Sequence, residues 1–119
     1  MTIRRMKTYT GEQGYVYQYY FVGKRAGVDV EAGPGTEYIF DVTADRKTMF
    51  AVSIFLPRRV LAAWADAHFR PLNDAEQYAA VKMRLFKAFD EIEDMLTDGR
   101  HLTVDIHLLE DMLGKLGVA

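Results

Sequence analysis

Residues 36–56, TEYIFDVTADRKTMFAVSIFL, decide the fold because they read as two strands joined by a turn. In residues 36–43 Tyr38, Phe40 and Val42 recur at every second position, which is the period of a strand with one buried face. Residues 48–56 repeat this alternation, and the ADRK between the two segments is typical of a tight turn. Short turns join antiparallel neighbours, so we expect a β-hairpin.

An aromatic stretch precedes this hairpin. Residues 15–22, YVYQYYFV, are rich in tyrosine, phenylalanine and valine, which favour a strand. Large side chains fall on both faces of this strand, and the pattern leaves open which face belongs to the core. Residues 23–35 contain four glycines and one proline, so we expect a loop there, with a short extended piece at residues 28–30.

After the hairpin the apolar period changes from two to about 3.6, which indicates helices. Pro57 suits the first turn of a helix that we expect to continue to about residue 67, before FRPLND interrupts the pattern. Asn73 and Glu76 have the spacing of a capping box and predict the start of a long helix over residues 74–97. Gly99 is a natural residue to end it.

The C-terminal segment carries two patterns. Residues 102–106 alternate like a strand, whereas the apolar residues from 108 to 116 recur at helical spacing, so we expect a short strand followed by a helix. Capping of that helix by Asp105 is the alternative. The whole pattern predicts an α+β fold: an antiparallel sheet of three to four strands, made of an N-terminal meander and a short C-terminal strand, packed on one face by two to three helices.

Composition limits the class of protein. A chain of 119 residues suits one domain, here residues 1–119, with residues 1–13 as an N-terminal arm that need not be ordered. The chain has no cysteine, which excludes disulfides, cysteine-ligated zinc and thiol catalysis. It also has no apolar run long enough for a signal peptide or a membrane span, so we expect a soluble cytoplasmic protein without a membrane partner.

Charge is distributed unevenly. Residues 1–25 carry five basic side chains and one acid, which would suit an anion or an acidic partner. The net charge of −2 makes nucleic-acid binding unlikely, since that affinity comes from many phosphate contacts. The acidic residues between 90 and 94 read as a solvated helix face, or as a counterpart to basic groups of a partner or of the N-terminal arm, namely Arg4, Arg5 and Lys7.

Candidates for chemistry are few. On a strand, His101, Asp105 and His107 would share one face and could ligate a metal or act as acid and base. No metal-binding motif accompanies them, so we interpret them as the polar side of an edge strand. The GKRAG at residues 23–27 lacks the pattern of a phosphate-binding loop, and the single serine, Ser53, lies inside a strand. We therefore expect no catalytic residue, no metal and no cofactor.

The sheet face turned away from the helices is the strongest candidate for function. Its apolar and aromatic side chains would form a large exposed patch, which soluble monomers rarely leave bare. The residues assigned to this interaction surface are Tyr15, Tyr17, Tyr20, Ile39, Met49 and Phe55. The sequence thus predicts a small non-catalytic interaction or regulatory module that forms a homo-oligomer or binds a protein partner. The alternative is a small-ligand binder or small enzyme with a pocket lined by Tyr and His on the sheet.

Overall fold

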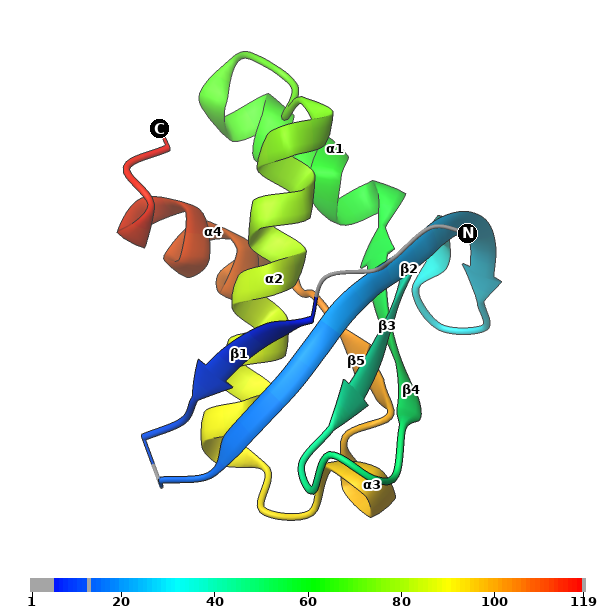
Figure 1. Cartoon of the computed structure of the whole chain (residues 1–119). Helices are drawn as coiled ribbons and strands as arrows, with labels where there is room; N and C mark the ends of the chain where they lie inside the picture. Colours follow the sequence, from blue (N-terminus) through cyan, green and yellow to red (C-terminus); the bar gives the residue numbers. More distant parts are fainter. Residues whose placement is uncertain (1–5, 13, 119) are drawn as a thin grey trace.

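The computed structural model describes residues 6–12 and 14–118. Five strands form one sheet in the order β1-β2-β3-β4-β5, and helices α1, α2 and α4 lie on one side of it (Figure 1). This is an α+β arrangement, as the sequence predicts, because four consecutive strands precede the first helix.

The sheet is mixed. Its strands are β1 (Lys7–Thr10), β2 (Val16–Asp29), β3 (Gly33–Thr43), β4 (Phe50–Pro57) and β5 (His101–Thr103). The pairs β1–β2, β2–β3 and β3–β4 are antiparallel, whereas β5 runs parallel to β4 with His101 opposite Ser53. The prediction of three to four strands, all antiparallel, is therefore wrong in both details. A parallel pair needs a long crossover, and the helices between β4 and β5 provide it.

Part of the predicted N-terminal arm is an edge strand. Lys7 and Tyr9 of β1 lie opposite Tyr19 and Tyr17 of β2. The Tyr9 ring stacks on Phe86 of α2, with the ring centroids 4.4 Å apart. These tertiary contacts hold a strand that is too short and too polar for its pattern to reveal. The suggested partners Arg4 and Arg5 lie outside the described residues.

Most of the glycine-rich segment is strand, not loop. β2 continues to Asp29 and β3 begins at Gly33, with a β-bulge between Phe21 and Gly23. The Asp29 carboxylate accepts hydrogen bonds from the backbone N–H groups of residues 31 and 32, at 3.0 and 2.8 Å, and so closes the turn. Glycine in a strand can mark a bulge or a close backbone approach as well as a loop, which is why composition misled the prediction.

Gly35 is one such close approach, and it gives a testable prediction. A Cβ atom there would lie 2.5 Å from the carbonyl oxygen of Leu56 and 2.9 Å from Cα of Pro57. We expect Gly35→Ala to lower the free energy of unfolding by about 1–3 kcal/mol, measured by urea denaturation. Gly27→Ala is the control, because its Cβ would meet only Phe55, at an ordinary 3.6 Å. Equal stability of the two variants would contradict this role for Gly35.

The first two helices begin at the residues that the sequence predicts for their starts. They are α1 (Arg58–His68), α2 (Asp74–Glu91), α3 (Met95–Asp98) and α4 (Ile106–Lys115). Pro57 directly precedes α1. At α2 the Asn73 side chain accepts from the Glu76 N–H at 2.8 Å and the Glu76 side chain accepts from the Asn73 N–H at 3.0 Å, which confirms the capping box. Within the described residues, none of the helices is both long and apolar enough to cross a membrane.

The long helix ends earlier than the sequence predicts. The helical hydrogen bonds of α2 stop at Ile92, and a separate turn of helix, α3, follows. Asp94 is the reason, because its carboxylate accepts a hydrogen bond from the Thr97 N–H at 3.2 Å and starts a new helix. Gly99 then ends α3 rather than α2.

The C-terminal strand is shorter than predicted. β5 covers only residues 101–103, and the Asp105 carboxylate accepts from the Leu108 N–H at 2.8 Å, which caps α4. The capping alternative for Asp105 is therefore confirmed.

The core lies between the sheet and the helices, and it identifies the inner face of β2. Tyr17 and Tyr19 are buried on the helix side, where the Tyr17 ring stacks on Phe89 with centroids 4.2 Å apart. The largest side chains buried with them are Trp64, Tyr38, Phe40, Phe89, Ile54, Leu56, Leu85, Leu109 and Leu113. The other face of β2 consequently belongs to the side of the sheet away from the helices.

Candidate interaction surface

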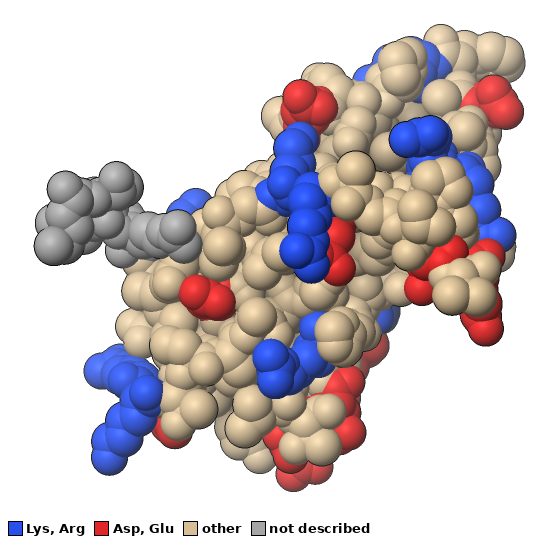
Figure 2. Space-filling view, turned by 90° about the vertical axis from the view of Figure 1, so that its right-hand side faces the viewer, with Lys and Arg blue, Asp and Glu red and all other residues tan. Residues whose placement is uncertain are grey.

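The outer face of the sheet is the candidate interaction surface. Alternation along β2, β3 and β4 turns one set of apolar side chains away from the helices. We define the outer face by Val16, Tyr20, Val22, Ile39, Met49, Ala51 and Phe55. Val16, Val22 and Met49 are 42%, 38% and 44% exposed. Figure 2 views the molecule from the right-hand side of Figure 1 and shows broad uncharged areas between separate charged groups.

Polar groups on the outer face are paired within the chain. The Tyr20 hydroxyl donates to Asp41 at 2.7 Å, and the Arg25 guanidinium donates to Glu37 at 2.7 Å. A hydrogen bond from Ser53, together with the contact to Arg25, lowers the pKa of Glu37 below its ordinary value in spite of its partial burial. The face therefore presents apolar side chains together with polar groups that already have partners within the chain, and the Arg25–Glu37 pair has no net charge.

A hollow of about 260 Å³ lies at the β5 end of this face. Its lining residues are Arg25, Gly27, Val28, Asp29, Glu37, Ser53, Phe55, His101, Leu102 and Thr103. The projecting β2–β3 hairpin supplies one wall, and β4 and β5 supply the floor. His101 does line it, but no tyrosine does, so the pocket differs from the Tyr/His-lined one that the sequence predicts.

The three weak metal candidates do not come together. His101 lies on β5, Asp105 uses its carboxylate to cap α4, and His107 is exposed in the first turn of that helix. The strand alignment on which a metal site depended is lost where α4 begins. Among the described residues, no three His, Asp or Glu side chains are close enough to hold a metal ion together.

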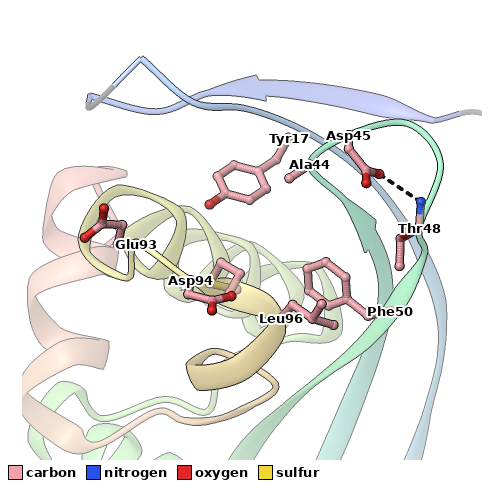
Figure 3. A pocket seen from close by; sticks show the side chains of 9 residues that line it. Tyr17, Ala44, Asp45, Thr48, Phe50, Glu93, Asp94 and Leu96 are labelled. Atoms are coloured by element: carbon pink, nitrogen blue, oxygen red, sulfur yellow. Dashed lines mark hydrogen bonds between the residues drawn. The ribbon is translucent and has the colours of Figure 1, made fainter.

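Two of the residues assigned to the interaction surface lie elsewhere. Tyr15 precedes β2 and is 45% exposed, whereas Tyr17 is only 3% exposed and packs in the core. The Tyr17 side chain reaches a different hollow, of about 200 Å³, between the β3–β4 turn and the α2–α3 connection (Figure 3). Glu93, Asp94 and Asp45 also line that hollow. Tyr20, Ile39, Met49 and Phe55 remain together on the outer face.

Asp90, the first residue of the acidic run at the end of α2, has a structural role. The Asp90 carboxylate accepts hydrogen bonds from the Tyr9 hydroxyl at 2.8 Å and from the Glu12 N–H at 2.9 Å. These bonds tie the β1–β2 connection to α2. Neither interpretation of the run anticipates them, because Tyr9 belongs to a strand that the sequence does not reveal.

The residues that sequence reasoning missed lie on the β2–β3 hairpin. Arg25, Gly27 and Val28 join the outer face and its hollow only because β2 continues past the bulge. Arg25 and Glu37 oppose each other in the register, and a pair of opposite charges at strand spacing is the signal that could have located them. No protein-family model, no curated protein and no solved structure matches this chain.

Proposed function

We propose that this chain is a non-catalytic interaction module that self-associates through the outer face of its sheet. The observation that carries the proposal is the set of apolar side chains on that face, which no helix of the described residues covers. Soluble proteins seldom leave such a patch in water, because burying it removes apolar surface from solvent. The lack of cysteine suits a reducing compartment, and we place the module in the cytoplasm.

A second copy of the chain suits this face better than a charged partner. In a symmetric dimer the same patch meets itself, so the surface must be complementary to its own composition. The Arg25–Glu37 ion pair has no net charge, so it would not repel its symmetry mate as a free like charge would. Aromatic and methionine side chains such as Tyr20, Phe55 and Met49 are also enriched at the centres of interfaces.

The size of the face predicts a weak dimer. Three strands that share about eight residues, with the four residues of β1 and the three of β5 beside them, give roughly 500 Å² of sheet at about 4.8 Å strand spacing and about 3.3 Å rise per residue. A stable interface buries about 800 Å² on each partner. We therefore expect a dimer whose population depends on concentration in the micromolar range, with no stable complex at nanomolar concentrations.

Sedimentation equilibrium or light scattering tests this proposal. The wild-type mass should rise from 13.6 kDa towards twice that value as the concentration increases. Tyr20→Lys with Phe55→Lys should remain monomeric, because the introduced ammonium groups would be buried in the interface. Lysine is chosen because Asp41 and Glu37 lie opposite these positions and would repel an introduced carboxylate.

The matched control is Phe69→Lys, which changes a fully exposed aromatic residue at the end of α1. This variant should dimerise like the wild type. A wild-type protein that stays at 13.6 kDa at several hundred micromolar would refute self-association.

A second candidate function, small-ligand binding, is favoured by the hollow at the β5 end. Arg25, Glu37 and His101 converge there beside Phe55, as polar groups do in a ligand pocket with an aromatic wall. A thermal-shift screen with metabolites and divalent metals should then give a hit that His101→Ala removes. A screen without stabilising compounds would leave self-association as the function of this face.

A further inference from the structure

Two lysines meet on the helix side of the sheet, away from the outer face. Lys7 precedes Tyr9 by two residues on β1, and Lys82 precedes Phe86 by one turn on α2. The rings of Tyr9 and Phe86 stack with centroids 4.4 Å apart. Two residues along a strand separate Lys7 from Tyr9 by about 7 Å, and one helical turn separates Lys82 from Phe86 by about 6 Å. The side chains of Lys7 and Lys82 are therefore neighbours.

Within the part of the chain that the structure describes, neither lysine has an ion-pair partner, because no carboxylate there lies within ion-pair distance of Lys7 or Lys82. Lys87 on the same helix differs, because its ammonium group is 2.7 Å from Glu91. Burial and then the charge of Lys7 lower the pKa of Lys82 below its ordinary value. Adjacent like charges without a counter-charge destabilise a free protein, and such arrangements are typical of binding sites for the opposite charge.

An apolar hollow adjoins Lys82. It measures about 260 Å³ and is lined by Tyr78, Ala79, Lys82, Met83, Phe86 and Leu116. The Lys82 ammonium group lies 5.8 Å from the ring centroids of both Tyr78 and Phe86, at the edge of this hollow. A ligand could therefore place a charged group at the lysines and an apolar group against the rings.

We propose that Lys7 and Lys82 bind the anionic group of an organic ligand, a phosphate or a carboxylate, whose apolar part lies in the hollow lined by Tyr78, Met83 and Leu116. The anion would supply a counter-charge between the two ammonium groups. The adjoining aromatic side chains lower the local polarity around Lys82, which strengthens the charge–charge interaction. This site is separate from the outer face and does not depend on self-association.

Calorimetric titration with four small probes tests the two halves of the site. Phenyl phosphate and benzoate carry an anion and a ring, inorganic phosphate carries only the anion, and benzyl alcohol carries only the ring. At least one of the first two should bind about tenfold more tightly than either single-feature probe. Comparison of phenyl phosphate with benzoate then identifies which anion the lysines prefer.

Variants assign the binding to these lysines. Lys7→Met and Lys82→Met should each weaken binding of the preferred probe about tenfold while keeping the circular dichroism of the wild type. Each should also raise the melting temperature of the free protein slightly, because one of two repelling charges is removed. Lys87→Met is the matched control and should leave the affinity unchanged.

Backbone amide shifts give an independent measurement of position. On titration with the preferred probe, the largest changes should fall around Lys7, Lys82 and Leu116. Absence of binding by phenyl phosphate and benzoate at millimolar concentration would overturn the proposal. Equal affinity of the wild type and the Lys7→Met/Lys82→Met double variant would also overturn it.

Discussion

Between pH 10 and 12 the protein is expected to unfold cooperatively. Burial raises the pKa values of Tyr17, Tyr19 and Tyr38 above 10, and burial together with the hydrogen bond to Asp90 raises the pKa of Tyr9 to about 12. These hydroxyls stay protonated in the folded state above pH 10, whereas they ionise in the unfolded chain.

The sign of the effect follows from proton binding. Above pH 10 the unfolded state binds fewer protons than the folded state, so the free energy of unfolding falls as pH rises. A tyrosine that stays protonated in the folded state lowers it by about 1.4 kcal/mol per pH unit, so Tyr17, Tyr19 and Tyr38 together lower it by about 4 kcal/mol per unit while they remain protonated. A small protein has about 5–15 kcal/mol of stability, and at this slope a stability in the lower half of that range is lost within about one to two pH units.

The measurement is a pH titration that follows tyrosinate absorbance and far-ultraviolet circular dichroism together. The absorbance change of the buried tyrosines should coincide with the loss of secondary structure. Tyr38→Phe should move this transition to higher pH, because the Tyr38 hydroxyl is buried without a hydrogen-bond partner among the described residues. Complete ionisation of the tyrosines in a protein that keeps its circular dichroism would contradict the prediction.

Trp64→Ala is expected to cost about 3–5 kcal/mol of stability, enough to leave a marginal protein partly unfolded. Trp64 is 0% exposed on α1. Its ring stacks on His68 with centroids 4.2 Å apart, and the Arg70 guanidinium lies 5.1 Å from it. Alanine would leave a large cavity where α1 meets the sheet. Urea denaturation followed by circular dichroism measures the loss.

Trp64→Phe separates packing from hydrogen bonding. The indole N–H of Trp64 has no hydrogen-bond partner among the described residues, so phenylalanine removes volume without breaking a bond. We expect it to cost clearly less than alanine. A phenylalanine variant as unstable as the alanine variant would show that the indole group makes a specific interaction that packing does not explain.

Local patterns were sufficient to predict the centre of the fold. The alternation in residues 36–56 predicts β3 and β4, and Asn73 with Glu76 predicts the start of α2, because each pattern depends on near neighbours in the sequence. The same alternation placed Ile39, Met49 and Phe55 on the outer face. To predict that these three residues share a face, it was enough to pair two strands that follow each other in the sequence.

Elements that depend on distant contacts could not be predicted. β1 is held by α2 through the Tyr9–Phe86 stack, and no local pattern marks it. Tyr17 was assigned to the interaction surface because large side chains occur on both faces of β2. Only the packing of Tyr17 on Phe89 shows which face is inside. The lysine pair likewise requires the position of β1 on α2.

Because β5 pairs with β4 but is far from it in the sequence, the sheet can be completed only late in synthesis on the ribosome. β4 can pair with β3 soon after synthesis, but its other edge lacks a neighbour until His101–Thr103 has been made. At roughly 5–20 residues per second this interval lasts several seconds. An open strand edge beside an apolar sheet is a site of misassembly between nascent chains, so chaperone depletion should reduce the soluble yield of this protein.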